Sequence, residues 1–166
     1  STKAPTIEMA DLNDIAREVI ALSTGELRRA GALLQTDFAG ELPHVRVDRV
    51  QVQQVILNLL LNAADAMAGV EDRPRTLLVR TGLHDDGNVK LLVQDSGTGI
   101  DPATVERLFE AFYTTKAKGM GVGLSISRSI IARHGGRLWA EANEGPGATF
   151  SFSIPSVPAH TGPPEK

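Results

Sequence analysis

A long amphipathic helix is predicted from Asp48 to Ala68, because this stretch contains no glycine or proline and its apolar residues recur at helical spacing. On such a helix the apolar residues share one arc, and a polar stripe runs along the border of that arc. The arc holds Val52, Val55, Ile56, Leu59, Leu60 and Ala63, and the stripe holds Gln54, Asn58, Asn62 and Asp65. Amide oxygens suit Mg²⁺, and amide nitrogens can donate to phosphate. Taken alone, the stripe is better explained as an ordinary solvated helix face.

The other segments mix hairpins with helices. Further helices are expected over residues 11–30, 101–109 and 124–134, and strands over residues 31–39, 76–83, 88–95, 137–142 and 148–154. Residues 84–87 have turn composition, which predicts a hairpin between the strands on either side. We therefore expect an α+β fold, a two-layer α/β sandwich with helices on one face of a mixed, mostly antiparallel sheet.

Three of these segments carry specific local signals. Asp101 and Pro102 predict a helix start, with an acidic N-cap and proline at the first helical position. The glycine pair at residues 135–136 predicts the end of the preceding helix. The strand at residues 148–154 alternates large apolar residues with serines, which predicts one buried face and one wet face.

Composition limits the number of domains and the class of partner. The chain has 166 residues, enough for one domain with a core. The absence of cysteine excludes a disulfide scaffold, a thiolate metal site and a cysteine nucleophile. A formal charge of −3 argues against nucleic acid or an anionic membrane as a partner, and no apolar run reaches the ~20 residues of a membrane span. We expect residues 1–7 to be a linker, residues 8–155 the domain, and residues 156–166, which are rich in proline, a disordered tail.

An aspartate between a strand and two glycines is the first candidate binding feature, in Asp95-Ser-Gly97-Thr-Gly99-Ile100. A carboxylate at a strand end can accept a hydrogen bond from an exocyclic amine, and flanking glycines let a flat ring approach the backbone. Considered by itself, the segment is better explained as a tight turn between strand and helix.

A second glycine cluster, residues 119–124, leads into a helix. Glycines at a helix N-terminus expose backbone N–H groups and the positive end of the helix dipole to an anion. The spacing is not that of a Walker P-loop, and no strand precedes it as in a dinucleotide fingerprint. The alternative is a flexible surface loop.

In order and spacing, four segments resemble the asparagine, first glycine, phenylalanine and second glycine boxes of bacterial sensor histidine kinases. They are residues 53–64, 95–100, 108–116 and 119–124, and residues 134–139 and 147–150 also resemble the family. The resemblance covers residues 8–155 and is strongest to oxygen-sensing and aromatic-sensing kinases. It implies the Bergerat-type ATP-binding fold that these kinases share with DNA gyrase, and ATP and Mg²⁺ as cofactors.

The resemblance also implies a role for each matched residue. Asp95 would accept a hydrogen bond from the adenine amino group, with Thr149 nearby through a water. Asn62 would hold Mg²⁺ against the phosphates, assisted by Asn58. Gly97 and Gly99 would give the ring room, Thr115 and Lys116 would approach the phosphates on closure, and Gly121, Gly123 and Leu124 would cradle the phosphates. Further contacts to ATP would come from Asp65, Ala66, Ile100 and Val122. Phe109 and Phe112 would anchor the lid that carries Thr115 and Lys116.

Two departures from related families bear on the reaction. Asn58 stands where gyrase-type hydrolases carry a glutamate that activates water, and an amide cannot act as a general base. Asp65 stands where many kinases carry a basic residue facing the nucleotide, so its charge would weaken phosphate binding unless it points away. We therefore expect phosphoryl transfer with slow ATP hydrolysis, although a gyrase-like ATPase stays an alternative.

None of the four histidines has the context of the family's phosphoacceptor, a helix with an acidic residue and a proline after it. The resemblance implies that the acceptor lies on a separate helical dimerisation domain upstream, and that a response regulator receives the phosphoryl group next. We expect this fragment to be cytoplasmic and monomeric. The runner-up is a nucleotide-sensing module that binds ATP without transferring phosphate.

Overall fold

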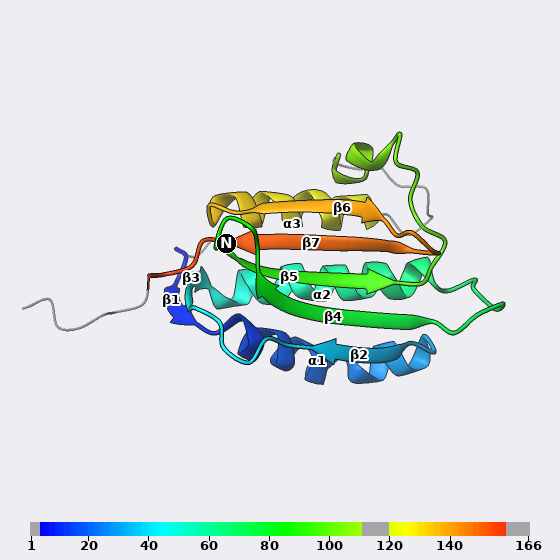
Figure 1. Cartoon of the computed structure of the whole chain (residues 1–166), viewed down its shortest axis with the longest axis horizontal. Helices are drawn as coiled ribbons and strands as arrows, with labels where there is room; N and C mark the ends of the chain where they lie inside the picture. The colour runs from blue at the N-terminus through cyan, green and yellow to red at the C-terminus, as the bar shows by residue number, and fades with distance from the viewer. Residues whose placement is uncertain (1–3, 111–119, 159–166) are drawn as a thin grey trace, which may run out of the picture.

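The computed structural model describes residues 4–110 and 120–158, which form helices on one face of a sheet (Figure 1). In chain order the elements are β1 Ile7–Ala10, α1 Leu12–Arg29, β2 Leu33–Asp37, β3 Val45–Asp48, α2 Arg49–Ala66, β4 Thr76–Leu83, β5 Val89–Asp95, the 3₁₀ helix η1 Val105–Phe109, α3 Met120–Arg133, β6 Arg137–Ala142 and β7 Ala148–Ile154. The predicted α+β sandwich is confirmed.

The main sheet has five strands in the order β2-β4-β5-β7-β6. The edge strand β2 runs parallel to β4, and all the other neighbours are antiparallel. The predicted hairpin between β4 and β5 is confirmed, with Gly87 at a φ of 86° in its turn. The helices α1, α2 and α3 cover one face of this sheet (Figure 1). Among the described residues no helix is long and apolar enough to cross a membrane.

The core lies between this sheet and the helices, and α2 is its central helix. All six apolar residues predicted for the buried arc of α2 are buried. Asp48 begins α2 as its N-cap by accepting a hydrogen bond from the backbone N–H of Gln51. The polar stripe of α2 borders the core, as its spacing indicated.

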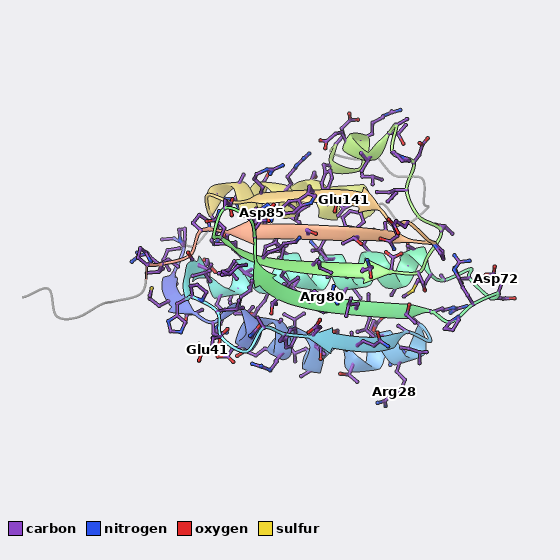
Figure 2. All side chains as sticks on the ribbon, viewed as in Figure 1. Arg28, Glu41, Asp72, Arg80, Asp85 and Glu141 are labelled. Carbon is purple, nitrogen blue, oxygen red and sulfur yellow. The ribbon has the colours of Figure 1, made fainter. Side chains whose placement is uncertain are left out.

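The predicted wet face on β7 is wrong, because Ser151 and Ser153 are only 1% and 2% exposed. Ser151 stands between Leu92 of β5 and Trp139 of β6. Two cations on the same face, Lys90 and Arg137, lie over the Trp139 ring at 5.7 and 5.3 Å. Long side chains from the neighbouring strands therefore cover the short serines. Figure 2 shows the charged side chains that project from this face, Arg80 and Glu141 among them.

Two further predictions about elements need correction, and two strands were missed. The helix expected over residues 101–109 is a turn followed by η1, because Asp101 closes the turn by accepting from the N–H of Ala103 at 3.0 Å. The helix expected from Leu124 begins four residues earlier, at Met120. The short strands β1 and β3 were not predicted, since each has four residues.

These two strands form a small antiparallel sheet beside the main one. Val45 of β3 also bridges to Ser156, and the N–H of Val157 donates to the carbonyl of His44 at 2.8 Å. Both ends of the described chain are thus attached to β3, at the end of the domain opposite the β5 carboxyl terminus (Figure 1).

Candidate functional site

A pocket lies where the ends of α2 and β5 meet the start of α3. Its enclosed volume is about 100 Å³. The lining residues are Asn62, Ala66, Asp95, Thr98, Gly99, Ile100, Leu108, Leu124, Ala148 and Phe150. The predicted residues Asn62, Ala66, Asp95, Gly99, Ile100 and Leu124 are therefore brought together. A mainly apolar lining with three polar side chains, those of Asn62, Asp95 and Thr98, and this volume suit a flat ring, and larger parts of a ligand would extend beyond it.

Asp95 is the charged group of the pocket. It ends β5 and is only 3% exposed. Its Oδ1 accepts hydrogen bonds from the backbone N–H of Gly97 at 2.8 Å and of Ala148 at 3.3 Å. Burying a carboxylate is costly unless it is hydrogen-bonded, and N–H donors to an ionised acceptor make strong bonds. The fold thus presents a fixed hydrogen-bond acceptor to the pocket.

Gly97 is not among the residues that line the pocket, and the structure shows a packing requirement at this position. A Cβ on Gly97 would lie 2.5 Å from the carbonyl oxygen of Ala66. The next residue, Thr98, donates its N–H to that same oxygen at 3.1 Å. Gly97 therefore allows the segment after β5 to pack on the last turn of α2, while Gly99, at a φ of 84°, lines the pocket itself.

The turn between β6 and β7 supports Asp95 from the other side. Asn143 donates from Nδ2 to the carbonyl of Asp95 at 2.9 Å and to that of Pro146 at 3.0 Å. A Cβ on Gly147 would overlap the Asp95 carbonyl oxygen, and Gly147 has a φ of 97°. Only glycine fits this position without strain. Neither Asn143 nor Gly147 belongs to the residues that the sequence predicts for the site.

Thr149 does not reach the pocket. Its hydroxyl donates to Asn143 Oδ1 at 2.6 Å and accepts from Gln94 Nε2 at 3.0 Å, on the sheet face away from the helices. Its neighbours Ala148 and Phe150 line the pocket instead. Successive side chains of a strand point to opposite faces, so Thr149 must face away from the pocket that Ala148 and Phe150 line.

The two asparagines of α2 have different surroundings. Asn58 donates from Nδ2 to the Ser127 hydroxyl at 3.1 Å and to the Gly123 carbonyl at 3.4 Å, which ties α2 to α3. Asn62 lines the pocket, and its side chain has no hydrogen-bond partner within residues 4–110 and 120–158. Asn62 is therefore the better placed of the two to contact a ligand.

The start of α3 places backbone donors beside the pocket. Gly121, Val122 and Gly123 lie in the first turn, where N–H groups have no partner within the helix, and Leu124 lines the pocket. Such a terminus favours an anion. Thr115, Lys116 and Phe112 lie outside the described residues. Phe109 is buried against Phe150, with ring centroids 6.3 Å apart.

Asp65 is half-buried on α2 and is not among the residues that line the pocket. Within the described part of the chain, no group of three His, Cys, Asp or Glu side chains could hold a metal ion. Mg²⁺ in nucleotide sites is commonly held by one or two protein oxygens together with the phosphates. The amide of Asn62 fits that arrangement, in which the nucleotide supplies most of the ligands.

A buried carboxylate in a pocket beside a helix N-terminus is an arrangement that suits a nucleotide, and comparisons identify the family of the chain. Residues 47–158, more than half of the chain, match the family described as histidine kinase-, DNA gyrase B- and HSP90-like ATPase, and the chain belongs to it. Its matched relatives are sensor histidine kinases. The sensor protein FixL of Bradyrhizobium diazoefficiens is 43% identical over 146 residues, which cover 88% of this chain and 28% of FixL.

Solved structures agree with this assignment. The nucleotide-free catalytic domain of the histidine kinase ThkA superposes with a TM-score of 0.79 at 32% identity, covering 91% of this chain and 96% of that one. Full-length ShkA in complex with AMPPNP superposes with a TM-score of 0.80 at 26% identity, covering 97% of this chain and 33% of that one. ThkA has also been solved in complex with the response regulator TrrA. This chain spans less than a third of the first four curated relatives.

Proposed function

We propose that this domain binds Mg·ATP and donates its γ-phosphoryl group to a histidine on a separate helical dimerisation and phosphoacceptor domain. The observation that carries the proposal is the buried Asp95 carboxylate, held by two backbone N–H groups in a pocket next to the start of α3. A base in the pocket and phosphates at the α3 terminus would account for both features.

In this proposal each polar group has a separate task. Asp95 accepts a hydrogen bond from the adenine amino group, between the apolar walls formed by Ile100 and Leu124. The N–H groups of Gly121 and Gly123 face the phosphates at the positive end of α3. Asn62 would hold Mg²⁺, which supplies charge neutralisation to the phosphates when bound.

The presence of Asn58 favours phosphoryl transfer to a histidine over hydrolysis of ATP by water. Its amide is hydrogen-bonded to α3, and an amide cannot remove a proton from water. The acceptor nitrogen would form a bond to the γ-phosphorus as the bond to the β,γ-bridging oxygen breaks, and ADP would leave. Positioning and charge stabilisation then account for catalysis, with little acid–base work by this domain.

The partners follow from the same proposal. The curated relatives are longer sensor kinases, and ThkA has been solved with a response regulator. We expect the acceptor histidine of this system on a helical domain of the same protein, and a response regulator that takes the phosphoryl group from it. The domain itself would act as a monomer in the cytoplasm, where ATP is available.

A thermal shift with Mg·ATP tests binding. The wild type should gain about 2.7 kcal/mol of stability at 100 times the dissociation constant, and Asp95→Ala should gain almost none. Asp37→Ala is the matched control, because Asp37 is an exposed carboxylate on the far edge strand. No shift in the wild type at millimolar nucleotide would contradict the proposal.

Transfer requires a second assay, with γ-labelled ATP and the helical domain supplied as a separate protein. Label on a histidine of that domain, lost when the histidine is replaced, is the expected result. Binding without transfer would favour a nucleotide-sensing module, and rapid release of phosphate without an acceptor would favour a gyrase-like ATPase.

A further inference from the structure

Arg73 connects the loop after α2 to the backbone that follows β5. Its Nε donates to the Ser96 carbonyl at 2.9 Å, and its Nη2 donates to the Gly97 carbonyl at 2.7 Å. Its Nη1 donates to the carboxylate of Asp72 at 2.9 Å. Figure 2 shows Asp72 at the tip of this loop, at the pocket end of the domain. The guanidinium is therefore committed to backbone oxygens beside the pocket.

The two carbonyls belong to peptide groups whose N–H ends also have partners. The Ser96–Gly97 peptide donates its N–H to Asp95 Oδ1 at 2.8 Å. The Gly97–Thr98 peptide donates its N–H to the Ala66 carbonyl at 3.1 Å. Each peptide group is thus held at both ends, by Arg73 on the carbonyl side. Rotating either one breaks a hydrogen bond to a charged donor, which is about twice as strong as a neutral one.

This arrangement couples Arg73 to the orientation of the Asp95 carboxylate. Of the two backbone hydrogen bonds to Asp95 Oδ1, the one from the Gly97 N–H is shorter than the one from Ala148. Arg73 holds the carbonyl of the same peptide group that carries this N–H. We propose that Arg73 is a positioning residue for Asp95, and that it thereby sets the preference of the pocket for adenine over guanine. This inference rests on the proposed function.

The chemistry of the two bases makes selectivity the relevant quantity. Adenine presents an amino donor where guanine presents a carbonyl acceptor, so a fixed carboxylate favours adenine and disfavours guanine. A site built to bond a donor rejects an analogue that lacks it. A carboxylate whose supporting peptide can rotate loses part of this discrimination. ATP and GTP carry the same phosphates, so any effect of Arg73 on phosphate binding cancels in the ratio of their affinities.

Arg75 is a matched control in the same loop. Its Nε donates to the Val70 carbonyl at 2.9 Å, and its Nη1 donates to the Ala30 carbonyl at 2.8 Å. Arg75 therefore has the same charge and also binds two backbone oxygens, but none of them belongs to the segment after β5. Loss of Arg75 should loosen the loop without releasing Asp95.

The test measures dissociation constants for Mg·ATP and Mg·GTP by calorimetry on the wild type, Asp95→Ala, Arg73→Ala, Arg73→Lys and Arg75→Ala. Arg73→Ala should weaken ATP binding about tenfold, equivalent to about 1.4 kcal/mol, and leave GTP binding within about twofold. Arg73→Lys keeps the charge and can bond one carbonyl, so its ratio of ATP affinity to GTP affinity should lie between those of the wild type and Arg73→Ala. Arg75→Ala should lower the melting temperature and keep the wild-type ratio.

The inference is overturned if the ratio of the dissociation constants for ATP and GTP is the same in Arg73→Ala as in the wild type. It is also overturned if Arg75→Ala loses as much selectivity as Arg73→Ala. If Arg73→Ala does not fold, an unchanged ratio in Arg73→Lys overturns it as well. Failure of the proposed function is recognised separately, because the wild type would then bind neither nucleotide, or Asp95→Ala would leave the ratio unchanged.

Discussion

The Cα of Gly147 faces the carbonyl oxygen of Asp95 with no space for a side chain between them. This contact joins the β6–β7 turn to the end of β5 and sets the position of Ala148, whose N–H bonds the Asp95 carboxylate. Gly147→Ala should therefore destabilise the fold by at least about 2 kcal/mol, through overlap and a φ of 97°. Denaturant unfolding of the free protein measures this change.

Gly145→Ala is the control for this prediction. Gly145 lies in the same turn, and a Cβ on it would meet no atom within 4 Å. Its free energy of unfolding should stay within about 0.5 kcal/mol of the wild type. Similar losses in the two variants would show that the turn tolerates no side chain anywhere, and that the contact with Asp95 is not the cause.

The two asparagines of α2 should separate stability from binding. Asn58→Ala removes a hydrogen bond to Ser127, which is fully buried, so it should cost about 1–3 kcal/mol of stability. Asn62→Ala should leave stability within about 0.5 kcal/mol and abolish the dependence of ATP binding on Mg²⁺. Thermal unfolding and titrations of ATP with and without Mg²⁺ measure the two effects. Equal Mg²⁺ dependence in wild type and Asn62→Ala would contradict the assignment.

Thr149→Val tests the placement of that residue outside the pocket. The change removes the hydroxyl that links Gln94 to Asn143, so we expect a loss of about 1 kcal/mol of stability. The dissociation constant for ATP should change by less than about twofold, below 0.5 kcal/mol. A tenfold weaker complex, measured by calorimetry, would return Thr149 to the binding site.

His134 joins the end of α3 to the start of α2. Its Nε2 accepts from the backbone N–H of Asp48 at 3.1 Å, and its Nδ1 lies 2.8 Å from the Ile130 carbonyl. His134→Ala should cost about 1–3 kcal/mol, because both backbone groups lose a partner. His44→Ala, at an exposed position, should change stability by less than about 0.5 kcal/mol. Indistinguishable melting temperatures for these two variants would refute the role of His134.

The sequence predicted the fold class and most elements because their signals are local. The apolar arc of α2, the hairpin turn at residues 84–87 and the glycine stop at 135–136 each depend on neighbouring residues alone. The prediction of a solvent-exposed face on β7 was wrong, because the burial of its serines comes from Leu92 and Trp139 on adjacent strands. Strand neighbours are not visible in a single sequence before the topology is known.

In the site, too, the residues with local sequence signals were predicted and those that depend on distant segments were not. Asp95 and Asn62 reach the pocket as predicted, since each sits on an element whose placement the sequence indicated. Arg73 and Asn143 were missed because they act on backbone oxygens of distant segments, and such contacts leave no motif. The resemblance predicted Thr149 near the base, whereas its hydroxyl bonds Asn143 and Gln94 and its neighbour Ala148 lines the pocket. The alternation of side chains along β7 accounts for this difference.

The attachment of both described chain ends to β3 has a mechanical consequence. Tension applied between residue 4 and residue 158 would load the hydrogen bonds of β1 and of Val157 to the segment around β3. Those bonds lie at the opposite end of the domain from Asp95 (Figure 1). A pull on the ends would therefore peel the small sheet first and leave the five-stranded sheet, with its pocket, out of the path of the force.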